Sequence, residues 1–193
     1  KERGYCAAPG TIAPCSYDVL ARPGGTLDAL FNNAACGQPG LGDDLPTHVL
    51  RAQFEANVFG WHDLTTRLLP AMHEQRAGRI VQCSSVLGFM AAPYRGAYNA
   101  SKFALEGLTD TLRLELHGSG IQVSSIQPGP IRSRFTLHAL NALKANIDHE
   151  NSRNKALYQK RITELEQIAG DEPAELETPE QSARITGNGW KPV

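Results

Sequence analysis

The chain has 193 residues and a mass of 20.9 kDa, which suits one domain with a sizeable hydrophobic core. Hydrophobic residues make up 41% and charged residues 20% of it, a balance that excludes a disordered or fibrous class. Nineteen basic and twenty acidic residues leave a formal charge of −1 without a basic stripe, so we expect no nucleic-acid partner.

The remaining composition argues against membrane insertion and against metal binding. No apolar run approaches about 18 residues, and no apolar segment follows the charged first residues, so we expect a cytoplasmic protein without a membrane span. The six histidines show no paired ligand spacing, which predicts no metal site. No C-x-x-C spacing occurs, and we expect reduced, packing thiols at Cys6, Cys15, Cys36 and Cys83.

The first predicted element is a buried strand over residues 27–31. Residues 1–16 before it show neither the helical nor the strand period of apolar residues. They also carry Gly and Pro, which predicts irregular chain. The stretch 37–42 after the strand is glycine-rich, but its spacing is not G-x-G-x-x-G. We interpret it as a loop on the substrate side and not as a phosphate cradle.

Residues 45–75 predict a helix in two pieces with a bend near Gly60. Asp44 or Thr47 can cap its start, and Pro46 suits a first turn.

A short strand over residues 79–83 comes next, followed by the Ser84-Ser85 pair and a loop rich in Gly, Ala and Pro. From about Ala97 the period becomes helical. The predicted inner face of this helix carries Leu105, Leu108, Leu112 and Leu116.

Tyr98 and Lys102 are four residues apart on that helix, so their side chains lie one turn from each other on one face. A free tyrosine has a pKa of about 10 and is a poor acid or base at neutral pH. A neighbouring ammonium favours the phenolate and lowers that pKa, which suits acid–base chemistry on an alcohol or carbonyl. Ser85 leaves the end of the strand, where its hydroxyl can reach the same oxygen.

Gly118 and Gly120 predict the end of this helix, because glycine readily adopts the left-handed conformation of a helix stop. A buried strand over residues 121–127 follows, and then the stiff turn 128–133 at its carboxyl end. Residues 137–168 predict a pair of helices, and residues 170–193 a loosely ordered tail.

Ser85, followed thirteen positions later by Y-N-A-S-K, resembles the active site of the short-chain dehydrogenase/reductase family. The resemblance implies that Tyr98 gives or takes a proton and that Lys102 lowers its pKa and holds the nicotinamide ribose. It implies further that Ser85 polarises the substrate oxygen. Asn57 stands where the family carries an asparagine that anchors a relay water.

Two turns add to the resemblance. Residues 32–35 are similar to the family's Asn-Asn-Ala-Gly turn with Ala35 in place of the glycine, and residues 128–133 to its Pro-Gly-x-Ile/Val-x-Thr turn with serine in place of threonine. The cofactor-binding residues that this implies are Asn33, Ala34, Tyr98, Lys102, Pro128, Gly129, Ile131 and Ser133.

The implied fold class is α/β, a Rossmann-like doubly wound parallel sheet that is apparently incomplete at its N-terminus. No Gly-x-x-x-Gly-x-Gly turn opens the chain, and only three strands are predicted, where the family's sheet has about seven. We expect residues 1–193 to form a single, partial dehydrogenase domain. An incomplete view of a longer chain, a truncated relative and a layer supplied by a partner chain each explain this, and we favour the first.

The implied function is NAD(P)(H)-dependent interconversion of a carbonyl and an alcohol by hydride transfer, with NADP or NAD as cofactor. The alternative is a truncated, catalytically silent binding or regulatory protein. The apolar loop 88–94 and the lid from Phe135 onward suit a lipophilic small-molecule substrate. The family resemblance also implies a homodimer or homotetramer through the helix 97–117 and its predecessor.

Overall fold

The computed structural model describes residues 26–131 and 133–170 and shows a three-stranded parallel sheet. The strands β1 (Ala29–Asn32), β2 (Gly78–Cys83) and β3 (Ile121–Ile126) are neighbours in chain order. The three predicted strands are therefore confirmed, with ends that shift by at most two residues. The predicted irregular segment 1–16 and all but the first residue of the predicted tail lie outside the described residues.

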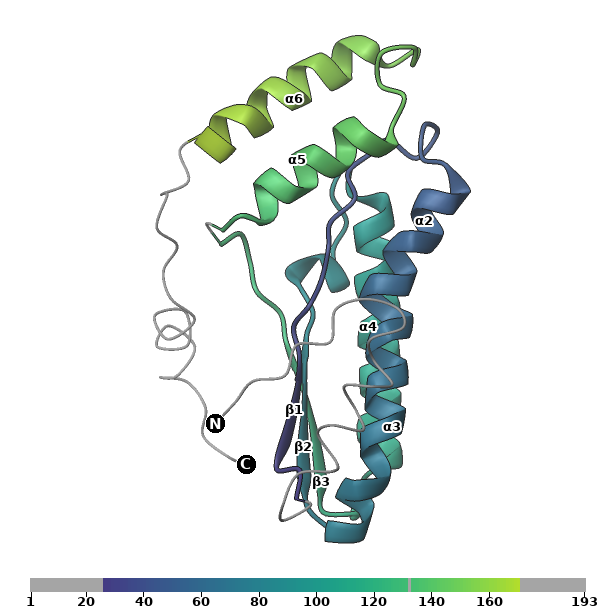
Figure 1. Cartoon of the computed structure of the whole chain (residues 1–193), viewed down its shortest axis with the longest axis vertical. Helices are drawn as coiled ribbons and strands as arrows, with labels where there is room; N and C mark the ends of the chain where they lie inside the picture. The colour runs from purple at the N-terminus through teal and green to yellow at the C-terminus, as the bar shows by residue number, and fades with distance from the viewer. Residues whose placement is uncertain (1–25, 132, 171–193) are drawn as a thin grey trace.

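Helices α3 (Gly60–Gln75) and α4 (Gly96–Glu115) lie against one face of this sheet, and α2 (Thr47–Phe54) lies beyond the strand ends beside α4 (Figure 1). Burial alternates along β1, as the period of two requires. On the helix side, Leu30, Ile80 and Val123 pack with leucine and methionine side chains of α3. On the opposite side Phe31 stays 54% exposed. Among residues 26–131 and 133–170, helices cover only one face of the sheet, whereas a doubly wound sheet is covered on both, so the described fold is Rossmann-like and incomplete.

The predicted interruption near Gly60 is a π-helical segment, η1 (Glu55–Phe59), between α2 and α3. A π-turn takes up an extra residue, and such segments are frequent at functional sites. The segment buries Asn57.

The predicted caps of this helix are wrong. Pro46 is the N-cap residue, and no side chain caps the first turn. The Asp44 carboxylate instead accepts hydrogen bonds from Ser152 Oγ at 2.8 Å and Asn154 Nδ2 at 3.0 Å, so a tertiary contact replaces the local one.

Helix α4 turns a largely polar stripe toward the sheet. Leu105 and Leu116 are buried as predicted, but Leu108 is 45% exposed, so the leucine spacing only partly identifies the inner face. The buried stripe recurs at helical spacing and comprises Tyr98, Ser101, Lys102, Leu105 and Thr109.

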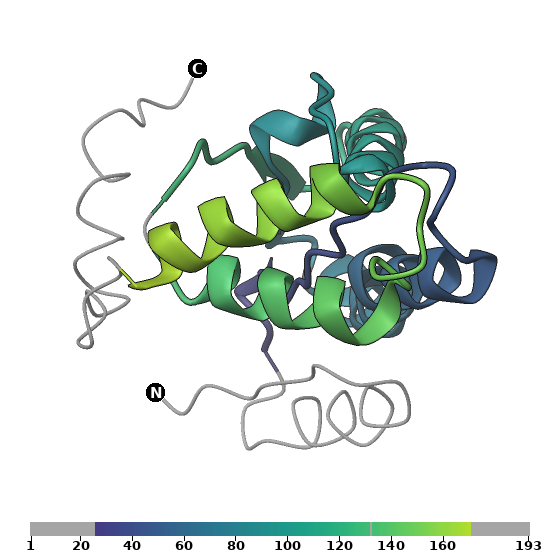
Figure 2. The same cartoon turned by 90° about the horizontal axis from the view of Figure 1, so that it is seen from above.

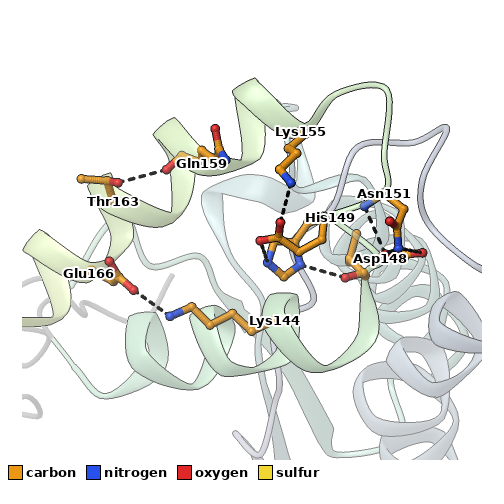
Figure 3. Close-up of polar contacts among 10 residues, drawn as sticks. Lys144, Asp148, His149, Asn151, Lys155, Gln159, Thr163 and Glu166 are labelled. Atoms are coloured by element: carbon orange, nitrogen blue, oxygen red, sulfur yellow. Dashed lines mark hydrogen bonds and ion pairs between the residues drawn. The ribbon is translucent and has the colours of Figure 1, made fainter.

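Helices α5 (Phe135–Asn146) and α6 (Lys155–Gly170) confirm the predicted helical pair and form a lid. They lie side by side above the carboxyl ends of the strands (Figures 1 and 2). The lid has its own apolar cluster, which includes Leu143 and Tyr158. An ion pair of 2.6 Å between Lys144 Nζ and Glu166 Oε1 also joins the two helices (Figure 3).

The predicted loop 37–42 lies at this same end of the sheet and supports the lid. The Tyr158 hydroxyl accepts a hydrogen bond of 2.9 Å from the Leu41 amide. A Cβ on Gly37 would lie 2.5 Å from Cζ of Phe135, so the glycine leaves room for the first residue of the lid.

The predicted stop after α4 is confirmed, because Gly118 and Gly120 have φ of 79° and 86°. Gly120 also lacks space, since an added Cβ would approach the Arg76 carbonyl oxygen to 2.1 Å, whereas nothing lies within 4 Å at Gly118.

We expect Gly118→Ala to lower the free energy of unfolding by about 1–3 kcal/mol, the usual cost of backbone strain. Gly120→Ala should lower it clearly more, and urea denaturation measures both. An equal loss in the two variants would contradict the described close approach.

Candidate active site

A cavity of about 810 Å³ lies at the carboxyl ends of the strands. Its walls come from the loops after β1, β2 and β3, from the start of α4 and from the lid. Ligands of open α/β sheets bind at this edge, because the loops that connect strands to helices converge there.

Ser85 enters this cavity from the loop that follows β2. It is the N-cap of the short 3-10 helix η2 (Val86–Gly88), and its Oγ accepts a hydrogen bond of 3.2 Å from the Leu87 amide. The loop is itself fixed to the end of β3, because the Ser84 amide donates to the Ile126 carbonyl at 2.8 Å. The hydroxyl of Ser85 is therefore held at a defined place on the cavity wall.

Tyr98 lies in the first turn of α4 and is 8% exposed. Its ring meets that of Phe135 edge-on, with 5.5 Å between the centroids. Burial raises the pKa of the phenol, while the hydrogen bond with Ser85 and the positive charge of Arg95 act in the opposite direction. The predicted lowering of this pKa is therefore wrong for the described structure, since desolvation outweighs the Ser85 hydrogen bond and the Arg95 charge.

Lys102 is 1% exposed, and its ammonium donates a hydrogen bond of 2.8 Å to the Cys83 carbonyl at the end of β2. The Nζ atom lies 4.6 Å from the ring centroid of Trp61 and 5.6 Å from that of Tyr98. Burial lowers the pKa of Lys102 to about 8, against the opposing effects of the Cys83 and Cys36 thiols. A lysine with this pKa can exchange a proton near neutral pH.

Asn57 is completely buried and does not line the cavity. Its Oδ1 accepts the Cys36 amide at 3.0 Å, and its Nδ2 donates to the Cys36 carbonyl at 3.0 Å and to Ser101 Oγ at 3.1 Å. The side chain thus joins the loop after β1 to α4, and its polar atoms are already engaged.

The residues that the resemblance assigns to the cofactor are mostly brought together. Ala34 is the exception, since its carbonyl accepts the indole N–H of Trp61 at 2.7 Å and it does not line the cavity. Ser133 Oγ accepts the Phe135 amide at 3.3 Å, so its hydroxyl helps to start the lid. The residues of this set found in the cavity wall are Asn33, Tyr98, Lys102, Pro128, Gly129, Ile131 and Ser133.

Sequence reasoning missed three cationic residues of the cavity wall, Arg95, Lys160 and Arg161. Arg95 stands three residues before Tyr98 at the start of the same helix, a spacing that could have indicated it. Lys160 and Arg161 lie on α6, and no local pattern connects them with the catalytic helix.

The described part of the chain shows neither a metal-binding cluster nor a membrane-spanning helix. Residues 26–131 and 133–170 contain no group of three His, Cys, Asp or Glu side chains arranged to hold a metal ion. Among the same residues, no helix has both the length and the apolar character needed to cross a bilayer.

Comparison with known proteins identifies the family. The family model described as short chain dehydrogenase matches residues 16–143. The chain is 49% identical over 129 residues to the uncharacterized oxidoreductase YbbO of Escherichia coli, covering 67% of this chain and 48% of that protein. It is 40% identical over 136 residues to dehydrogenase/reductase SDR family member 7B of Rattus norvegicus, covering 70% of this chain and 42% of that protein.

Solved structures support the same family. A short-chain dehydrogenase from Streptomyces avermitilis aligns with a TM-score of 0.61 and 40% identity, over 63% of this chain and 44% of that one. The structure of ElxO with NADP bound aligns with a TM-score of 0.58 and 28% identity, over 61% and 48% of the two chains.

The chain spans about half the length of the curated relatives it matches. The family model covers more than half of the chain, and the matched residues hold the three parallel strands, α4 and the Ser85, Tyr98 and Lys102 side chains. As the sequence motifs predicted, the chain belongs to the short-chain dehydrogenase family.

Proposed function

We propose that the protein is an NAD(P)(H)-dependent oxidoreductase that interconverts a carbonyl compound and its alcohol. One observation carries the proposal: Ser85, Tyr98 and Lys102 meet in one cavity at the carboxyl edge of a parallel sheet. The names of the relatives, oxidoreductase and dehydrogenase/reductase, support the same class of reaction.

In the proposed reaction, the Tyr98 hydroxyl gives its proton to the carbonyl oxygen during reduction, and Ser85 donates a hydrogen bond to the same oxygen. The raised pKa of Tyr98 keeps the phenol protonated at neutral pH, which suits the acid that reduction requires. The nicotinamide cofactor supplies or takes up the hydride when it is bound. Oxidation of an alcohol runs the same proton transfer in reverse.

Lys102 has two proposed roles. Its ammonium approaches the cofactor ribose, and its pKa of about 8 lets it return a proton toward Tyr98 after each turnover. Asn57 is proposed to anchor the relay water. Since its side chain is engaged with Cys36 and Ser101, we assign this role to its backbone carbonyl in the π-helical segment.

The cofactor proposed is NADP or NAD. Asn33, Pro128, Gly129, Ile131 and Ser133 line the cavity and are proposed to receive the nicotinamide half. Ile131 would contact the nicotinamide carboxamide through its backbone. Ala34 would support the turn of residues 32–35 beside the cofactor. The NADP in the ElxO structure supports a coenzyme of this class.

We further propose a homodimer or homotetramer built on α3 and α4, supported by Phe103 and Leu108, which are 47% and 45% exposed on α4. A cytoplasmic location is also proposed. The free thiols of Cys36 and Cys83 support it, because reduced cysteines are usual there.

Tyr98→Phe tests the acid–base assignment. We expect it to abolish turnover while the affinity for coenzyme stays nearly unchanged, because only the hydroxyl is lost. The measurement is oxidation of NADPH or NADH with a straight-chain aldehyde, beside a coenzyme titration followed by nicotinamide fluorescence. Retained turnover would refute the role of Tyr98. Failure of the wild-type protein to bind either coenzyme near millimolar concentration would favour the silent binding protein instead.

Lys102→Met tests the buried ammonium through stability. The folded pKa of about 8 lies below the unfolded value of about 10.4, so the folded state holds the lysine proton less tightly. The cost of burying the charge is therefore fully present below pH 8 and disappears as the pH rises toward 10.4. We expect the stability of the wild type relative to Lys102→Met to rise across this window in coenzyme-free urea denaturation. A difference independent of pH would contradict the lowered pKa.

A further inference from the structure

Two guanidinium groups reach the cavity from different elements. Arg95 is the N-cap residue of α4, and Arg161 lies on the lid helix α6. Both side chains are half-buried and both line the cavity that holds Tyr98. Lys160 adds a third positive charge to the same wall.

Carboxylates balance these three cations only in part. In the part of the chain that the structure describes, Arg161 pairs with Glu164 at 2.9 Å, whereas Arg95 and Lys160 have no carboxylate within ion-pair distance. The buried Nε of Arg161 has no hydrogen-bond partner. The pKa of Arg95 is lowered first by burial and then by the positive charge of Arg161, so the two groups repel each other in a partly dry site.

The cavity wall also carries apolar side chains, among them Leu87, Phe135 and Leu157. Phe135 touches the ring of Tyr98. The Tyr94 hydroxyl donates to the Leu157 carbonyl at 3.3 Å, and the Tyr94 ring lies 5.9 Å from the guanidinium carbon of Arg161. A ligand in this cavity therefore has hydrogen-bonding groups, apolar side chains and positive charges within reach.

We propose that Arg161 and Arg95 bind an anionic group of the substrate, so that the protein acts on carbonyl compounds with an apolar chain and a carboxylate or phosphate. The proposal rests on the proposed function, because it names the substrate class of the same cavity. It sharpens the lipophilic substrate expected from the sequence to an amphipathic one.

The chemistry of the side chains supports this assignment. A guanidinium presents paired N–H donors that match the oxygens of a carboxylate or phosphate, and such bonds strengthen where water is excluded. An anion would partner the free Nε of Arg161 and relieve the repulsion between the two arginines. One carboxylate, Glu164, lies in the same wall and would oppose the anion.

Binding is measured first by calorimetry on the full chain, without coenzyme and without turnover. The probes are decanoate and decyl phosphate, with decanol as the neutral match. We expect Arg161→Gln to weaken the binding of at least one anion by about tenfold or more and to leave decanol unchanged. Glu164→Gln should tighten binding of the same anion. Lys144→Gln is the control, since it removes a lid charge that pairs with Glu166 outside the cavity (Figure 3).

The decanoate and decyl phosphate arms identify which anion the site takes. Equal losses of decanol and anion in Arg161→Gln would overturn the proposal, and so would weaker or unchanged anion binding in Glu164→Gln. The second variant keeps the test decisive if Arg161→Gln does not fold.

Turnover separates this inference from the proposed function. With an alkanal and the ω-oxo acid of equal length, we expect Arg161→Gln to raise KM for the oxo acid only. If NADPH is oxidised but the variant changes both substrates equally, the anion site is refuted and the function stands. If the anions bind as expected but no carbonyl compound is reduced, the proposed function is refuted and the anion site stands.

Discussion

The hydrogen bond of 2.8 Å from the Lys102 ammonium to the Cys83 carbonyl joins α4 to the end of the central strand β2. Placing an ammonium where it is 1% exposed is costly, as its pKa of about 8 indicates, and the carbonyl dipole and the Trp61 ring partly offset that cost. Because the ammonium has its hydrogen-bond acceptor at this strand end, α4 docks in one register. Tyr98 lies one turn before Lys102 on α4. It is thereby placed beside Ser85, which lies two residues after the end of β2.

The site divides between two layers of the molecule. The strand ends and α4 supply the groups proposed for proton transfer, whereas the lid supplies the Phe135 ring against Tyr98 and the Arg161 charge. The lid has its own apolar cluster and is tied to the loop after β1 through Tyr158. A change in the lid can therefore alter which substrate is accepted while leaving the Lys102–Cys83 contact untouched.

Local patterns predicted the strands and the helical pair of the lid, because periodicity encodes neighbours along one element. The family resemblance indicated Ser85, Tyr98 and Lys102, and the spacing of four placed Tyr98 and Lys102 on one face of a helix. Local patterns failed where contacts between distant residues determine the position of a side chain. Leu108 faces outward because polar residues occupy the inner stripe of α4, and Asp44 binds the lid instead of capping α2. The raised pKa of Tyr98 depends on burial, which no spacing reveals. Arg95 and Arg161 line one cavity although they lie far apart in the chain.

The chain spans about half the length of the curated relatives it matches, and we propose that its residues carry the proton-transfer half of the chemistry. The central claim is that this half supports hydride transfer to a carbonyl carbon. Incubating the full chain with an aldehyde and NADPH deuterated at its hydride-donating carbon tests it most directly. The account predicts one deuterium on the carbinol carbon of the product and none with Tyr98→Phe. Coenzyme bound to the wild-type protein without any transfer of deuterium would contradict it.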